Sequence, residues 1–367
     1  MALDEMYGSG AEHDEAFVAA MREAVAWHLE KNEPYRELAR QDGYSLENLR
    51  TLQDVAHIPH VFINVFKQYE LLSIPREAIA LNLTSSGTTG QKSQVFFDQR
   101  SLERGLRMVD RAYEAMGLVR RDLPTNYLIF AYDPKEARNV GTAYTDSNLT
   151  KLAPKNRTYH ALRWDEERQS FTFREAETLT VLQSYAEEGL PVRFIGFPAF
   201  LHRMVSSMRD RKLPKLRLGK DSCVLTGGGW KTSENERIDP AEFVSEIEAY
   251  LGIPGANVRD GYGMVEHGVP YLQCEYHRFH VPTFSRAFIR EVSTLEVLPD
   301  GEVGFLHLVT PYNLAMPAHS LLVSDLATMA RGCPCGRPTP TIAIQGRAGT
   351  RKNKGCAISA SQLLTRT

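Results

Sequence analysis

The segment Thr84–Ser93, with the sequence TSSGTTGQKS, has the composition of an anion-binding loop. Its two glycines let backbone N–H groups turn toward a phosphate, its hydroxyls donate further hydrogen bonds, and Lys92 supplies positive charge. A Walker loop requires glycine directly before Lys-Ser, and Gln91 occupies that position here. On composition alone, a flexible hairpin between two strands is an equal alternative.

Four further short motifs follow along the chain, and each is a weak signal by itself. They are Gly227-Gly228-Gly229, Tyr262-Gly263-Met264-Val265-Glu266, Ser324-Asp325-Leu326-Ala327 and Gly346-Arg347. Together with the loop they stand in the order typical of the acyl-adenylate-forming superfamily, which the chain therefore resembles. That resemblance implies that a carboxylate attacks the α-phosphate of ATP and that pyrophosphate leaves.

Within this superfamily the chain resembles the LuxE family of acyl-protein synthetases and is also similar to phenylacetate-CoA ligases. The first resemblance rests on Gly227-Gly228-Gly229-Trp230-Lys231 and Lys354-Gly355-Cys356-Ala357, and the second on Cys333-Pro334-Cys335-Gly336-Arg337. Two departures stand out, because Val265 replaces a usual Thr and Gly349-Thr350 replaces an Asp at the hinge.

The resemblance implies a set of nucleotide-binding residues and a magnesium ion. Glu266 would bind Mg²⁺, Tyr262 would stack on adenine and Asp325 would bind the ribose, whereas an ion-paired Glu, a core Tyr and a helix-capping Asp are the ordinary alternatives. The implied ATP and AMP contacts are Thr84, Ser85, Ser86, Gly87, Thr88, Thr89, Gly90, Lys92, Gly227, Gly228, Gly229, Tyr262, Gly263, Asp325 and Arg347.

Relatives carry a catalytic lysine on a mobile C-terminal lid domain, and we expect that domain to be truncated here. Lys231 or Lys354 would then replace that lysine, and the sequence does not decide between them. Phe197 and Pro198 lie where relatives build one wall of the acyl pocket, although a plain strand-to-helix turn explains them equally well.

Five cysteines, Cys223, Cys274, Cys333, Cys335 and Cys356, are an odd number in a chain without an export signal, which does not favour a disulfide framework. Cys274, His280, Cys333 and Cys335 form a candidate structural zinc site of the Cys₃His type, with His277 as the alternative to His280. Their spacing is not that of a zinc finger, but the similarity to phenylacetate-CoA ligases supports zinc. Cys223 is expected in the core.

Cys356 stands near three cations, Arg351, Lys352 and Lys354, which favour the nucleophilic thiolate. The resemblance to the LuxE family implies that this cysteine carries the acyl group. An ordinary tail thiol is the alternative.

The elements that must position these residues follow from hydrophobic patterns. We predict helices at 12–43 with a break at 32–34, at 102–116 and at 241–251, and a mostly helical stretch at 45–72. Apolar runs predict strands at 78–83, 94–98, 127–132, 192–196 and 222–226, and residues 284–330 have strand patterns. The class is α/β, an adenylate-forming fold with a β-rich subdomain. We expect an adenylating domain at 1–345, helical over 1–75, and a hinge and tail at 346–367.

The 367 residues are 43% hydrophobic and 24% charged, with a formal net charge of −2, so neither nucleic acid nor an anionic membrane is indicated. We find no secretory signal and no apolar run of about 18 residues, and expect a cytoplasmic protein. The leading hypothesis is activation of a carboxylic acid, which we expect to be a fatty acid, to acyl-AMP, followed by transfer to Cys356 and delivery to an acyl-protein reductase or acyl carrier protein. The alternatives are a ligase that acylates coenzyme A or a carrier protein directly, and a non-catalytic scaffold.

Overall fold

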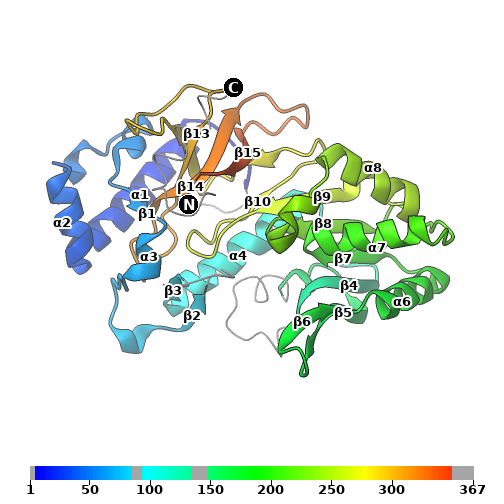
Figure 1. Ribbon diagram of the computed structural model, residues 1–367. Helices are drawn as coiled ribbons and strands as arrows, with labels where there is room; N and C mark the ends of the chain where they lie inside the picture. The colour runs from blue at the N-terminus through cyan, green and yellow to red at the C-terminus, as the bar shows by residue number, and fades with distance from the viewer. Residues whose placement is uncertain (1–4, 85–92, 134–147, 349–367) are drawn as a thin grey trace. The chain divides into compact units, whose positions relative to one another are not determined.

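The computed structural model describes residues 5–84, 93–133 and 148–348, and its chain divides into two compact units (Figure 1). The first unit combines Met1–Ala115, Met264–Tyr271 and Arg278–Thr367, and the second combines Met116–Gly263 and Leu272–His277. Each unit is therefore assembled from more than one segment of the chain.

The first unit begins with two helices, α1 (Ala11–Lys31) and α2 (Glu33–Gln41). Between them the Asn32 side chain accepts a hydrogen bond from the backbone N–H of Tyr35 at 3.0 Å, which caps α2. The predicted helix with a break at 32–34 is thus confirmed. Helix α1 buries one face in a cluster with residues from later segments, namely Phe17, Val18, Met21, Val25, Leu49, Val55, Ile58 and Val309.

The next segment was predicted to be mostly helical over 45–72, and this prediction is wrong. Asp54 accepts hydrogen bonds from the backbone N–H groups of Arg50 and Thr51, a local arrangement that competes with helix, and Pro59 cannot donate one. Only short pieces form: η1 (Leu46–Asn48), η2 (Gln53–His57), β1 (Val61–Phe62), α3 (Val65–Gln68) and η3 (Arg76–Ala78).

A hairpin and a long helix follow. Strands β2 (Leu81–Thr84) and β3 (Gln94–Phe97) pair antiparallel, with Thr84 opposite Gln94, and the Asp98 side chain caps the start of α4 (Gln99–Ala115) through the Ser101 N–H. Both predicted strands and the predicted helix are confirmed, and the strands flank the candidate phosphate loop.

The first unit also holds a six-stranded sheet in the order β11-β15-β14-β13-β12, with β1 parallel to β14. Its neighbouring strands in that order pair antiparallel, which confirms the strand-rich prediction for 284–330. The strands are β11 (Phe279–His280), β12 (Arg286–Arg290), β13 (Gly304–Val309), β14 (Ser320–Ala330) and β15 (Thr341–Arg347).

The second unit is built on a seven-stranded sheet in the order β10-β9-β8-β7-β4-β5-β6. From β9 to β5 the neighbours are parallel, and β6 is antiparallel to β5. The strands are β4 (Thr125–Tyr132), β5 (Lys155–Asp165), β6 (Ser170–Phe173), β7 (Val192–Gly196), β8 (Cys223–Gly227), β9 (Val258–Tyr262) and β10 (Tyr271–Leu272).

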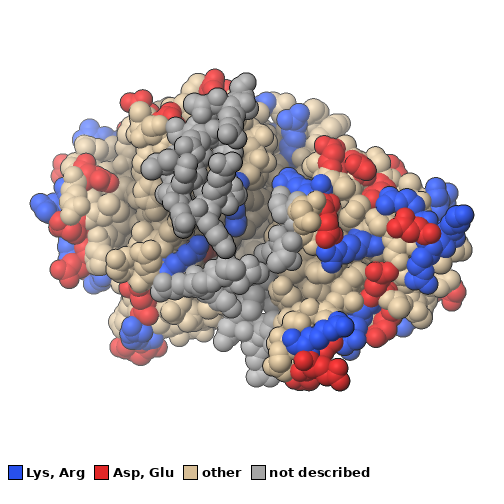
Figure 2. All heavy atoms as spheres, viewed as in Figure 1, with Lys and Arg blue, Asp and Glu red and all other residues tan. Residues whose placement is uncertain are grey.

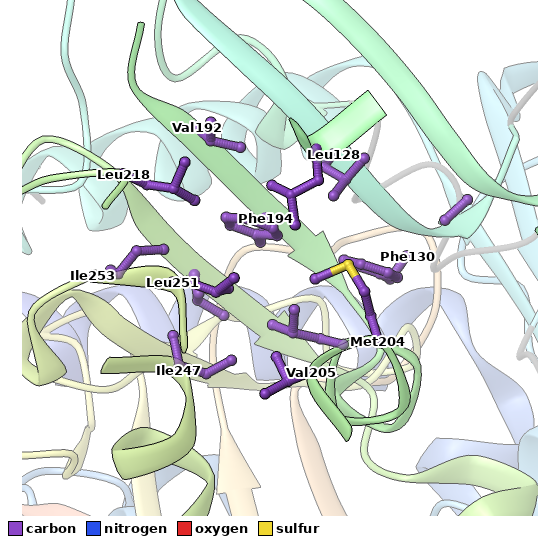
Figure 3. Close-up of a cluster of buried hydrophobic side chains, with 14 of the residues drawn as sticks. Leu128, Phe130, Val192, Phe194, Met204, Val205, Leu218, Ile247, Leu251 and Ile253 are labelled. Atoms are coloured by element: carbon purple, nitrogen blue, oxygen red, sulfur yellow. The ribbon is translucent and has the colours of Figure 1, made fainter. Parts of the chain in front are cut away.

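Helices α6 (Glu175–Glu188), α7 (Pro198–Asp210) and α8 (Pro240–Leu251) contribute to the core of this unit, joined by η4 (Lys231–Glu236) and η5 (Gly255–Asn257). Figure 3 shows Phe130 and Phe194 of adjacent strands beside Met204 and Val205 of α7. Alternate strand residues such as Ile129 and Ile195 are also buried, as expected for parallel strands covered on both faces.

Acidic and basic side chains are interspersed among the described residues on the face seen in Figure 2, in keeping with the small net charge. None of the helices in the described ranges is long and apolar enough to cross a bilayer.

Buried histidines form part of the first unit's core. The His28 ring stacks on His319 with 4.6 Å between centroids, its Nδ1 lies 2.8 Å from Ser73 Oγ, and Nε2 of His319 lies 2.8 Å from the hydroxyl of Tyr35. Burial lowers the pKa of His28 to about 4 and that of His319 well below its usual range. Both rings are therefore neutral in the folded protein at pH 7.

We predict that the protein loses stability as pH falls from about 6.5 toward 4. In the unfolded chain His28 takes up a proton at the ordinary histidine pKa, whereas in the folded protein it does so only near pH 4. Within that window each such group therefore lowers the free energy of unfolding by about 1.4 kcal/mol for each pH unit of acidification. Urea unfolding between pH 7.5 and 5 measures this slope. His28→Gln should make it shallower, and the exposed His57→Gln serves as control. Equal slopes in both variants would contradict the prediction.

Candidate active site

The carboxyl ends of four parallel strands meet at one edge of the second unit's sheet. In register, Phe130 of β4 lies beside Gly196 of β7, Gly196 beside Thr226 of β8, and Gly227 beside Gly261 of β9. The residues that follow these strands therefore share this edge, which is where ligands bind in open α/β sheets.

The glycine turn after β8 exposes its backbone at this edge. Gly228 and Gly229 have φ of 74° and 68°, in the left-handed region that favours glycine, and both are exposed. Apart from its chain neighbours, no atom of the described residues lies within 4 Å of the position a Cβ would take on Gly229. A flat ligand can therefore approach the main chain here without meeting side chains.

Side chains of α7 and α8 hold the residues that follow this turn in place. The buried Trp230 ring lies 5.6 Å from the ring of His202, whose Nδ1 is 2.7 Å from the Glu246 carboxylate. Arg203 forms an ion pair with Glu236 at 2.6 Å, and this pair holds η4. Lys231 begins η4, and its side chain is outside the described residues.

A half-buried residue, Asp260, lies between the glycine turn and Tyr262 in the sequence. It accepts hydrogen bonds from the Thr226 hydroxyl at 2.8 Å and from the Gly261 N–H at 3.0 Å. Burial raises the pKa of Asp260, and these two bonds oppose the rise. Tyr262, at the end of β9, is half-buried.

Aromatic rings cover the start of α7 at the same edge. Phe197 is buried, and its ring centroid lies 5.6 Å from that of Tyr132 and 6.3 Å from that of Phe200. Pro198 is buried as the first residue of α7. The chain can turn so tightly here because Gly196, with φ of 121°, packs directly on the carbonyl of Phe130.

In the first unit, Asp325 and Arg347 face each other across strands β14 and β15. Arg347 Nε donates to Asp325 Oδ1 at 3.0 Å. Asp325 is buried, whereas 78% of the Arg347 side chain is exposed. The pair thus places a carboxylate beside an exposed guanidinium, two groups suited to a diol and a phosphate.

Glu266, also in the first unit, is only 5% exposed. No hydrogen bond or ion pair joins its carboxylate to another residue of the described chain. A buried carboxylate without such a partner is costly unless a cation or a proton neutralises it. The residue therefore has the chemistry of a ligand for a hard cation.

Three candidate zinc ligands of the first unit, His280, Cys333 and Cys335, have their ligand atoms within 4.8 Å of one another. His280 Nε2 is 3.2 Å from Cys335 Sγ, while its Nδ1 lies 3.2 Å from the hydroxyl of Thr339. This second contact orients the ring as second partners of zinc-bound histidines do. Cys274 is buried on the segment Leu272–His277 of the second unit, where His277 is half-buried.

A family model described as "Acyl-protein synthetase, LuxE" matches residues 4–365. The chain belongs to this family. A member of known sequence from Aliivibrio fischeri, named long-chain-fatty-acid–luciferin-component ligase, is 28% identical over 347 residues, covering 94% of this chain and 87% of that protein. The predicted LuxE resemblance is therefore confirmed.

The predicted similarity beyond the LuxE family is also confirmed. A phenylacetate-coenzyme A ligase of Thermus thermophilus is 23% identical over 326 residues, covering 86% of this chain and 66% of that protein. A crystal structure of 2-hydroxyisobutyryl-CoA ligase with 2-HIB-AMP and CoA superposes with a TM-score of 0.68 at 15% identity, covering 95% of this chain and 78% of that one. This likeness confirms the predicted fold class.

The remaining sequence-predicted residues lie outside the described chain. These are Cys356 and, in the loop between β2 and β3, Ser85, Ser86, Gly87, Thr88, Thr89, Gly90 and Lys92. Thr84 ends β2, Gly263 follows β9, and Cys223 is buried in β8, where burial raises its pKa. Sequence reasoning missed Asp260 and Thr226; a carboxylate inside an otherwise strand-like run was the available signal for Asp260.

We predict that Gly196→Ala destabilises this LuxE-family protein by about 3 kcal/mol or more. A Cβ at this position would collide with the carbonyl oxygen of Phe130, and alanine disfavours φ of 121°. Gly189→Ala, at φ of 74° with open space around the Cβ, isolates the conformational cost of about 1 kcal/mol. Urea unfolding compares the two. Equal losses would show that the close approach to β4 is not limiting.

Proposed function

We propose that this protein uses ATP to convert a fatty acid to acyl-AMP and then transfers the acyl group to a thiol. The observation that carries the proposal is the family match over residues 4–365. The name of the Aliivibrio fischeri relative, a long-chain-fatty-acid ligase, supports a fatty acid as substrate.

The residues proposed for the nucleotide offer different kinds of contact. In the second unit, the open backbone of Gly227–Gly229 and the ring of Tyr262 suit a purine, with Gly263 beside it. In the first unit, Asp325 suits the ribose diol and Arg347 a phosphate. Thr84 ends the strand that leads into the loop, and Lys92 with the loop's hydroxyls and backbone would bind the phosphates.

Glu266 would hold Mg²⁺, which when bound neutralises charge on the phosphate oxygens. Its burial without a partner among the described residues supports this role. Lys231 would place positive charge near the reacting phosphate, and the Arg203–Glu236 ion pair that holds η4 supports a fixed position for its backbone. Lys354 is the alternative lysine.

In the reaction, a carboxylate oxygen of the fatty acid forms a bond to the α-phosphorus while the bond to the pyrophosphate oxygen breaks. The protein contributes alignment and charge rather than covalent chemistry in this step. Phe197 and Pro198 would form one wall of the acyl pocket, which their burial among aromatic rings at the sheet edge supports.

Cys356 would then attack the acyl carbonyl as a thiolate, so that a thioester forms and AMP leaves. The acyl group would pass to a partner, an acyl-protein reductase or an acyl carrier protein. The similarity to a phenylacetate-coenzyme A ligase favours one alternative, direct transfer to coenzyme A.

Zinc would bind His280, Cys333 and Cys335 together with Cys274, which precedes His280 by only six residues and is buried. The site would be structural, because four protein ligands leave no open position. Four cysteines of the described chain take no part in a disulfide, which supports a reducing compartment, and we propose the cytoplasm. We also propose that residues 1–345 form the adenylating domain and that residues 346–367 form a hinge and tail.

We predict that Lys92→Ala and Cys356→Ser separate the two half-reactions. Lys92→Ala should lower fatty-acid-dependent pyrophosphate exchange about 10²- to 10³-fold through lost charge at the phosphates. Cys356→Ser should retain exchange but lose the hydroxylamine-sensitive acyl label on the protein. Glu187→Gln, an exposed site on α6, is the control.

The outcomes of these assays decide between the candidate functions. Full labelling of Cys356→Ser would place the acceptor elsewhere, and a soluble thioester formed with coenzyme A would establish direct ligation. Normal pyrophosphate exchange in Lys92→Ala would rule out the proposed phosphate-binding role of the loop. If no fatty acid supported exchange in the unaltered protein, the non-catalytic scaffold would be favoured.

We predict about one zinc per chain in protein purified without chelators. Cys333→Ser and His280→Ala should each release zinc and lower the unfolding temperature, because a closed site contributes folding free energy. Cys223→Ser, a buried cysteine outside the set, should keep the metal. Elemental analysis and thermal unfolding measure both effects. Zinc-free protein with reactive Cys333 and Cys335 would refute the site.

A further inference from the structure

A cavity of about 490 Å³ opens in the first unit, away from the residues proposed for ATP. Its lining residues come from the chain between the end of α2 and His60 and from the end of β12. The side chains that determine its chemistry are Asp42, Tyr44, Asp54, His57, His60 and Arg290. The cavity is therefore polar and brings together charges from segments far apart in sequence.

Arg290, the last residue of β12, places a buried positive charge at this cavity. Its Nε donates to His307 Nδ1 at 3.0 Å, its Nη1 to the Leu295 carbonyl at 2.6 Å, and its Nη2 to the Ala56 carbonyl. All three acceptors are neutral. Within the described ranges no carboxylate forms an ion pair with this guanidinium.

Burying the Arg290 charge without a countercharge is unfavourable in free energy, and the backbone at one of its hydrogen-bond acceptors is strained. Burial lowers the pKa of the Arg290 guanidinium. Leu295, whose carbonyl accepts from Arg290, has φ of 61°, a left-handed conformation that is strained for a leucine. Strain of this kind is typical of binding sites rather than of ordinary packing.

Two neutral hydrogen-bonding groups accompany Arg290 on the cavity wall. His60 makes no hydrogen bond to the described chain, and burial together with Arg290 lowers its pKa to about 4. The Tyr44 hydroxyl is buried without a hydrogen-bond partner in the described residues, and burial raises its pKa to about 12. At pH 7 both groups are uncharged, and each offers one proton to a ligand.

Two carboxylates also line the cavity, and neither neutralises Arg290. Oδ2 of Asp54 accepts from the N–H groups of Arg50 and Thr51 and from the Thr51 hydroxyl, at 2.7–3.0 Å. Asp42 is exposed at the end of α2. Their presence confines any anion to the Arg290 end of the cavity.

We propose that this cavity binds an oxyanion, the terminal phosphate or carboxylate group of a small ligand, at Arg290. Arginine has five N–H donors and the three contacts above use three, so two remain for oxygens of a ligand. A charged acceptor would also supply the countercharge that the neutral acceptors do not. The inference goes beyond the proposed function and does not depend on it, because the residues proposed for ATP do not line this cavity.

Calorimetric titration of the full chain with inorganic phosphate, and separately with acetate, tests the proposal at constant ionic strength set by sodium chloride. We expect one saturable site per chain. Saturation with phosphate alone identifies a phosphate group, with acetate alone a carboxylate, and with both the shared oxyanion chemistry. Arg290→Gln should weaken binding at least about tenfold, and Arg290→Lys less. No saturable heat with either anion would overturn the proposal.

Three further variants locate the site and keep the test decisive if Arg290 variants do not fold. Asp42→Asn should tighten binding about two- to fivefold by removing a nearby like charge, whereas Asp110→Asn, exposed on α4, should leave it unchanged. Lys92→Ala should retain binding. Loss of binding in Lys92→Ala would place the anion in the ATP loop, and equal effects of the two aspartate variants would exclude the cavity; either result overturns the proposal.

Discussion

Parallel pairing of β4, β7, β8 and β9 is the constraint from which the candidate active site follows. Parallel strands end at the same edge, so Tyr132 at the end of β4, Phe197 after β7, the glycine turn after β8 and Tyr262 at the end of β9 share that edge. The pairing in turn depends on Gly196, because no side chain fits against the Phe130 carbonyl. Main-chain geometry, rather than any single polar contact, thus decides which side chains can act together.

The first unit is organised differently, around the eleven-residue strand β14. Its first residues pair with β13 on one side and with β1 on the other, and its second half pairs with β15. Asp325 lies in that second half, opposite Arg347, and its carboxylate is oriented by the hydrogen bond from Arg347 Nε. The β-rich part of the fold therefore supplies an oriented carboxylate, while the parallel sheet supplies open backbone.

Hydrophobic runs predicted the buried strands well, because residues 127–132 and 192–196 lie in strands that are covered on both faces. The exposed strand β5 escaped notice, since it begins with the polar residues Lys155, Asn156 and Arg157. The glycine turn and Tyr262 were found through the resemblance to the acyl-adenylate-forming superfamily, because their motifs stand in the matching order. The contact of Thr226 with Asp260 was not, because it depends on the register between β8 and β9, which is a property of tertiary pairing.

The discontinuous make-up of the first unit has a consequence for synthesis on the ribosome. Its N-terminal helices pack on Val309, and β1 pairs with β14, so this unit cannot close until residues beyond 320 have emerged. The second unit lies almost entirely in the uninterrupted segment Met116–Gly263, and only the six residues Leu272–His277 come later. This unit can therefore already have folded by then. The order of assembly is thus the reverse of the order of translation, and the earliest-made helices spend the longest time with their apolar faces unprotected.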